Sequence, residues 1–106
     1  MKHHDLFVIG TGSGNSVIDD SMADWDIGIV DQRRAGGTCL NYGCIPPSKM
    51  LAYTAEVVDT VSSANRFGVD AKLGGMNWTE VRDRVFGLTD RHSDEGREGR
   101  ASTSNI

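Results

Sequence analysis

The sequence feature that most limits the fold is a glycine-rich turn directly after a short apolar run. Leu6–Ile9 is wholly apolar, and it leads into Gly10-Thr11-Gly12-Ser13-Gly14-Asn15. A second run of strand type, Ile27–Val30, ends at Asp31. Such short runs bounded by turn residues are typical of buried parallel strands. Residues 15–22 between them have the one-sided apolar pattern of a short helix. The first thirty residues therefore predict a βαβ unit and an α/β fold.

The glycine turn has the position of a dinucleotide-binding loop. Gly10 permits a tight turn, and Gly12 allows the backbone to approach a pyrophosphate. Ser13 and Gly14 complete the turn, and the amino end of the following helix would face the anion. Asn15 stands where the usual pattern has a third glycine, so the match is imperfect. An ordinary strand-to-helix turn is the alternative.

Asp31 ends the second strand nineteen residues beyond Gly12. A carboxylate at this place can accept both ribose hydroxyls of an adenosine, and it disfavours a phosphorylated ribose at that site. The other interpretation is a solvated strand end. In the βαβ context we expect Asp31 to belong to a nucleotide site.

Cys39 and Cys44 are the two cysteines of the chain, with four residues between them. A disulfide needs the two α-carbons within about 7 Å, so this segment must form a turn, which Gly43 makes easier. Such a small ring removes little chain entropy, so reversible thiol–disulfide exchange is favoured over a stabilising role. A helix is expected directly after Cys44, and its amino end should lower the pKa of that thiol.

Two other uses of the cysteines remain open. A zinc site would need further ligands, and His3, His4 and His92 have no matching ligand spacing, so we expect no metal. Two inert buried thiols are the other alternative.

The second half of the chain predicts helices. Apolar side chains recur at helical spacing over residues 49–64, and Ser48 can cap that helix. A shorter helix is expected over residues 78–87, capped by Asn77 or Thr79. Residues 89–106 contain few apolar side chains, and we expect a loop or a disordered segment there.

Length and charge limit the class of protein. A chain of 106 residues fits one domain, here residues 1–88 followed by the polar segment 89–106. The formal net charge is −4 without a basic stripe, which argues against nucleic acid and against anionic membranes as partners. No apolar run approaches the roughly 20 residues of a membrane helix. A cytoplasmic location is expected, where closely spaced cysteines serve chemistry rather than stapling.

The segment around the cysteines resembles a known family signature. Gly36-Gly37-Thr38-Cys39-Leu40-Asn41-Tyr42-Gly43-Cys44-Ile45-Pro46 is similar to the motif of the class I pyridine nucleotide-disulfide oxidoreductases. Within that family, the Gly10–Ser16 turn, the short helix before Trp25, and Trp78 followed by Arg84-Val85-Phe86-Gly87 are most similar to the mycothione-reducing members.

This resemblance implies a Rossmann-like, FAD-binding βαβ unit, an incomplete part of a larger three-layer domain. It implies a homodimeric enzyme in which NADPH or NADH reduces FAD and the flavin reduces the cysteine pair. The implied substrate is a small-molecule disulfide, with mycothione as the first candidate. Cys39 resembles the thiol that attacks the substrate, and Cys44 the thiolate that contacts the flavin. The family's catalytic His-Glu pair belongs to later sequence. The positions that match those around FAD are Gly10, Gly12, Asp31, Gly37, Thr38 and Lys49.

One departure from the family concerns Lys49. Family members usually have a single proline before the Ser/Thr-Lys pair, whereas this chain has Pro46-Pro47 before Ser48-Lys49. One extra residue in a helix rotates the residues after it by about 100°. Either the loop absorbs it, which we expect, or Lys49 is displaced from the flavin.

Two rival functions remain. A dihydrolipoamide dehydrogenase-type enzyme shares the cysteine loop and differs in the glycine turn and the region of Trp78. A nucleotide-binding module without redox activity would make the cysteines incidental.

Overall fold

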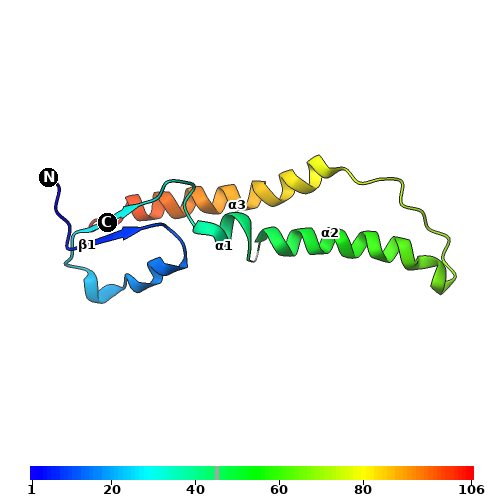
Figure 1. The fold of residues 1–106 in the computed structure, drawn as a ribbon, viewed down its shortest axis with the longest axis horizontal. Helices are drawn as coiled ribbons and strands as arrows, with labels where there is room; N and C mark the ends of the chain where they lie inside the picture. The colour runs from blue at the N-terminus through cyan, green and yellow to red at the C-terminus, as the bar shows by residue number, and fades with distance from the viewer. Residues whose placement is uncertain (45) are drawn as a thin grey trace.

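The computed structural model describes residues 1–44 and 46–106, so Ile45 of the cysteine motif lies outside the described residues. A small parallel sheet lies at one end and a long pair of helices extends from it, over 68 × 24 × 18 Å (Figure 1). The elements are strands β1 (Leu6–Ile9) and β2 (Ile27–Val30), helices α1 (Gly37–Tyr42), α2 (Pro46–Ser63) and α3 (Trp78–Ala101), and three short 3₁₀ segments, Ser13–Val17, Asp20–Met22 and Ala64–Phe67.

Both strands have the predicted bounds, and they pair in parallel. Leu6 lies opposite Ile27, and the register continues to Ile9 opposite Val30. Gly28 lies beside Phe7, whose ring atoms lie 2.5 Å from where a Cβ on Gly28 would be. The glycine therefore makes room for the ring. The result is mixed α/β with a two-stranded parallel sheet, in agreement with a partial Rossmann-like unit.

The prediction of a helix over residues 15–22 is wrong. The chain forms two 3₁₀ segments there, and Ile18 between them is extended. Asp19 accepts hydrogen bonds from the backbone N–H of Ser21 at 2.9 Å and from its hydroxyl. Such local side-chain bonds compete with helical ones, and this explains the short turns.

The expectation of a loop or disordered segment over residues 89–106 is also wrong for most of its length. Helix α3 continues to Ala101. Its buried positions are Val81, Val85, Thr89 and Ser93, four residues apart, so they form one stripe along the helix. The stripe changes from apolar to small polar side chains at Thr89, which hides it from a search for apolar periodicity.

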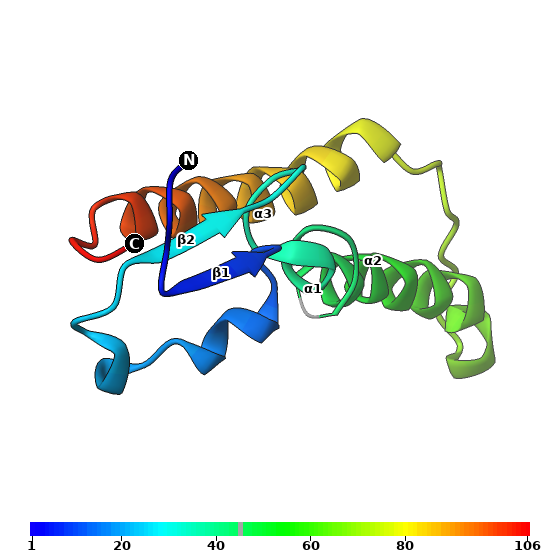
Figure 2. The same cartoon turned by 60° about the vertical axis from the view of Figure 1, so that its left-hand side comes forward.

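The end of the chain returns to the sheet. Ile27 donates its backbone N–H to the carbonyl of Asn105 at 2.9 Å, and the Asn105 amide donates to the carbonyl of Met22 at 3.0 Å. Figure 2 shows α3 lying alongside β2. The last residues of the chain thus add a second support to β2.

Helix α2 begins three residues before its predicted start and ends one residue before its predicted end. Pro46 and Pro47 form its first turn, where the missing N–H groups cost no helical hydrogen bond. Ser48 donates its hydroxyl back to the carbonyl of Gly43. Pro47 is buried and Lys49 is exposed.

Candidate active site

The glycine turn follows β1 directly. Gly10 has a φ of +101°, a backbone conformation suited to glycine, and donates its N–H to the carbonyl of Val30 at 2.6 Å. The side-chain amide of Asn15 donates to the carbonyl of Gly10 at 2.7 Å. The backbone N–H of Asn15 donates to the carbonyl of Gly12 at 3.0 Å. Asn15, the departure from the glycine pattern, therefore closes the turn with a hydrogen bond.

Asp31 lies beside the same turn. One of its oxygens accepts from the backbone N–H of Thr11 at 2.9 Å and from its hydroxyl at 2.5 Å, and the other accepts from the N–H of Arg33 at 3.0 Å. The hydroxyl of Thr11 first, then the N–H groups of Arg33 and Thr11, hold the pKa of Asp31 below its ordinary value. The carboxylate is therefore ionised at neutral pH.

Thr11 also joins the turn to the cysteine loop. The hydroxyl oxygen of Thr11 accepts a hydrogen bond from the backbone N–H of Gly36 at 3.0 Å, and Thr11 is buried. Gly12 and Gly37 touch backbone to backbone, because a Cβ on Gly37 would lie 2.6 Å from the α-carbon of Gly12. With a φ of +66° at Gly37, any larger residue would push the two loops apart.

The cysteines lie at the two ends of a short turn. Cys39 belongs to α1 and is half-buried, whereas Cys44 follows Gly43 and is exposed. The N–H of Cys44 donates to the carbonyl of Cys39 at 3.0 Å. Both thiols are free in this structure.

The prediction that the pKa of Cys44 is lowered is wrong for this state. Hydrogen bonding with the Cys39 thiol, followed by desolvation and the charge of Cys39, raises the pKa of the Cys44 thiol. The helix end behind it begins with Pro46 and Pro47, which have no N–H to offer a thiolate. The protonated thiol of Cys44 is therefore favoured over its thiolate.

The turn and the thiols line one groove of about 540 Å³. Its walls are Val8, Ile9, Gly10, Gly12, Ser13, Gly14, Asn15, Thr38, Cys39 and Cys44. The structure thus brings together seven of the ten residues predicted for the site. The groove is where a ligand held at the glycines would reach the sulfur atoms.

The other three predicted residues lie outside this lining. Asp31 lines an adjacent cavity of about 410 Å³ that shares Ile9 and Gly10 with the groove. Gly37 contacts the groove through Gly12. Lys49 is exposed on α2 and lines neither space.

Sequence reasoning did not find Thr11 and Ser93. Thr11 occupies a variable position of the glycine pattern, and only its contacts reveal its role. Ser93 reaches the cysteine loop from α3, and the four-residue spacing from Val81 is the one signal that could have found it.

Neither a metal-binding cluster nor a membrane-spanning helix occurs among the described residues. Residues 1–44 and 46–106 contain no group of three or more His, Cys, Asp or Glu side chains that could hold a metal ion. In the same ranges, no helix combines the length and apolar character that crossing a membrane requires.

Comparison with known proteins gives relatives but no matching family model. Mycothione reductase of Mycobacterium tuberculosis (strain ATCC 25618 / H37Rv) is 44% identical over 106 residues, which is 100% of this chain and 23% of the relative. Dihydrolipoyl dehydrogenase of Bacillus subtilis (strain 168) is 34% identical over 90 residues, 83% of this chain and 19% of the relative. That of Chlamydia trachomatis is 40% identical over 82 residues, 76% of this chain and 17% of the relative.

The chain therefore spans about a quarter of the length of mycothione reductase and less than a fifth of these two dihydrolipoyl dehydrogenases. The match to mycothione reductase includes the glycine turn, both cysteines and α3, because it extends over the whole chain. By this homology, the chain belongs to the class I pyridine nucleotide-disulfide oxidoreductases.

Proposed function

We propose that this chain supplies the FAD-binding and thiol part of an NAD(P)H-dependent flavoprotein reductase of a small-molecule disulfide. The observation that carries this proposal is the groove in which Gly10, Gly12 and Gly14 lie together with Cys39 and Cys44. The glycine turn and the thiol pair share one space, which a flavin-to-thiol electron transfer would require.

The residues of the turn fit FAD. A Cβ on Gly10 or Gly14 would meet nothing within 4 Å, so the turn borders open space. Gly12 caps the following 3₁₀ segment without a side-chain hydrogen bond, which leaves the start of that segment to a pyrophosphate. Ser13 would add a hydroxyl at the same place.

Asp31 fits the adenosine ribose. A carboxylate has about four acceptor positions, and Thr11 and Arg33 use three of them through three hydrogen bonds. Asp31 is thus a fixed, ionised acceptor with one position left, which suits one ribose hydroxyl and not both as the sequence predicted. Gly37 and Thr38 would border the flavin, whereas Lys49 is exposed on α2 and lines neither the groove nor the cavity at Asp31.

The bound flavin would supply two-electron exchange between a nicotinamide and the cysteine pair. In the proposed exchange, the thiolate of Cys39 attacks one sulfur of the substrate disulfide, forms a mixed disulfide and releases one thiol. Cys44 then attacks the sulfur of Cys39, which forms the protein disulfide and releases the second thiol. The protein dithiol is oxidised and the substrate is reduced to two thiols.

Mycothione is the proposed substrate, because the match to mycothione reductase extends over the whole chain at 44% identity. Dihydrolipoamide is the second candidate, since the dihydrolipoyl dehydrogenases of Bacillus subtilis and Chlamydia trachomatis match 83% and 76% of this chain. A homodimer, NADPH or NADH as reductant and a cytoplasmic location belong to the same proposal.

Flavin binding tests the cofactor part of this proposal. FAD titrated into the chain should lose fluorescence as it binds, and Gly12→Val should weaken binding at least tenfold, because its side chain would crowd the backbone of Gly37 and narrow the approach to the turn. Gly74→Val, in the exposed connection between α2 and α3, is the matched control. Equal binding by wild type and Gly12→Val would remove FAD from the groove.

A nucleotide module without redox activity is the rival function. Thiols are counted before and after mild oxidation of the flavin-loaded chain. Loss of two thiols, restored by dithiothreitol, supports the reductase. Two thiols that persist while FAD stays bound support the rival.

A further inference from the structure

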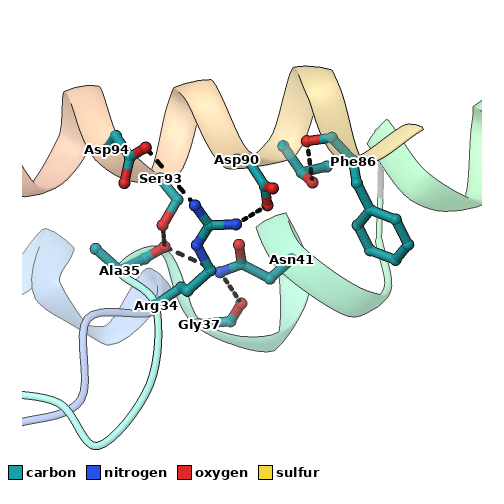
Figure 3. Close-up of polar contacts among 9 residues, drawn as sticks. Arg34, Ala35, Gly37, Asn41, Phe86, Asp90, Ser93 and Asp94 are labelled. Atoms are coloured by element: carbon teal, nitrogen blue, oxygen red, sulfur yellow. Dashed lines mark hydrogen bonds and ion pairs between the residues drawn. The ribbon is translucent and has the colours of Figure 1, made fainter. Parts of the chain in front are cut away.

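The carbonyl oxygen of Ala35 accepts hydrogen bonds from two elements. The amide of Asn41 in α1 donates to it at 2.9 Å, and the hydroxyl of Ser93 in α3 donates at 2.7 Å (Figure 3). Relative exposures are 8% for Ala35, 4% for Asn41 and 2% for Ser93. The contact between the cysteine loop and α3 is therefore closed to water.

An ion pair lies beside this buried contact. Arg34 pairs with Asp90 and lies 3.6 Å from a carboxylate oxygen of Asp94 (Figure 3). Asp90 and Asp94 are four residues apart on α3, so they flank Ser93. Two successive residues of the loop, Arg34 and Ala35, are thus fixed to α3.

The loop needs such outside contacts, because its own backbone is permissive. Gly36, with a φ of +104°, directly precedes the thiol helix α1, and Gly37, with a φ of +66°, is its first residue. Asn41 donates a second hydrogen bond, to the carbonyl of Gly37 at 3.0 Å. Its buried side-chain oxygen has no hydrogen-bond partner among the described residues, so these two bonds set the amide orientation.

Cys39 follows this fixed point by four residues. Only Gly36, Gly37 and Thr38 separate Ala35 from Cys39, which lies in the first turn of α1. Cys44 depends on the same helix, since its N–H donates to the carbonyl of Cys39. The contact at Ala35 therefore lies directly before the helix on which both thiols depend.

We propose that Ser93 is a positioning residue for the Cys39–Cys44 pair, with Arg34–Asp90 as a second tie between α3 and the cysteine loop. This inference rests on the proposed redox role of the pair. Ser93 touches no reacting atom, and it acts through the Ala35 carbonyl. Removing its hydroxyl should lower the effective concentration of one thiol at the other and expose Cys39.

The test uses the full chain and two readouts, for wild type and Ser93→Ala. The first is the equilibrium in which the two thiols and one glutathione disulfide give the protein disulfide and two glutathione thiols. The second is the ratio of iodoacetamide modification rates at Cys39 and Cys44, by peptide mass spectrometry. Ser62→Ala is the matched control, because its hydroxyl donates to a carbonyl of its own helix, Val58, at 2.8 Å.

Ser93→Ala should lower the oxidation equilibrium constant by about threefold to tenfold, the effect of one hydrogen bond of ordinary net strength. The Cys39:Cys44 modification ratio should rise at least threefold, with Cys44 as internal reference. Ser62→Ala should change neither by more than about twofold. Unchanged values in folded Ser93→Ala, or equal acceleration at both cysteines, would overturn the proposal.

Asp90→Asn provides a second route if Ser93→Ala does not fold. It removes the charge from the surface pair and should raise the modification ratio, whereas Asp83→Asn, which breaks the Arg82–Asp83 pair on the same helix, should not. Equal ratios in these two variants contradict the proposal. If the wild-type pair does not oxidise, the redox function fails, while the modification ratio still decides the positioning role.

Discussion

At the residue scale, Thr11 joins three parts of the site. Its hydroxyl donates to Asp31 and accepts from the N–H of Gly36, so the carboxylate proposed for the ribose and the cysteine loop share one side chain. The sequence predicted Asp31 but not this partner, because a variable position of a glycine motif has no signature. The role became visible only through distances.

Thr11→Val should destabilise the chain by about 1–3 kcal/mol, since it leaves the N–H of Gly36 without its partner and removes one bond to Asp31. Urea unfolding followed by circular dichroism measures this. Thr11→Ser keeps the hydroxyl and should retain most of the stability. Equal unfolding midpoints for wild type and Thr11→Val would contradict the linking role.

Cys44 provides a pH prediction. Its pKa is raised mainly by hydrogen bonding with the Cys39 thiol, so less thiolate exists at a given pH. Cys39→Ala removes that partner, and the pKa of Cys44 should fall. The midpoint of the pH–rate profile for alkylation of Cys44 should therefore move to lower pH, with faster modification at pH 8. A midpoint that stays in place or rises would show that the two thiols do not interact.

At the scale of elements, the accuracy of prediction followed the kind of side chain at the packing face. The strands at Leu6–Ile9 and Ile27–Val30 were predicted with correct bounds because parallel strands typically form short apolar runs. The 15–22 segment was misjudged because Asp19 bonds to Ser21 instead of to helical partners. The second half of α3 was missed because it packs through Thr89 and Ser93.

Glu95→Pro tests the continuation of α3. Residue 95 is exposed, so a proline would be harmless in a loop, but within a helix it should cost about 3 kcal/mol. Far-UV circular dichroism and urea unfolding measure the loss of helix and stability, and Glu95→Ala is the control. Wild-type behaviour of Glu95→Pro would restore the loop prediction.

At the scale of the whole molecule, a thin core supports an extended shape. The buried apolar residues of the described chain are Ile27, Ala35, Val81 and Val85, and the Ile9 side chain at the end of the sheet is 86% exposed. Specific polar contacts therefore have a large share in holding the sheet, the cysteine loop and α3 together. The motifs predicted which residues form the site, but not that α3 supports it, since that depends on contacts 58 residues apart.

The visible absorbance of bound flavin reports directly on the thiol beside it. The FAD-loaded chain is reduced with dithiothreitol and its spectrum is recorded at rising pH. We expect a long-wavelength thiolate-to-flavin band in wild type that persists in Cys39→Ala and is lost in Cys44→Ser. Absence of the band in flavin-loaded wild type, at a pH where Cys44 is alkylated rapidly, would contradict a shared flavin and thiol site.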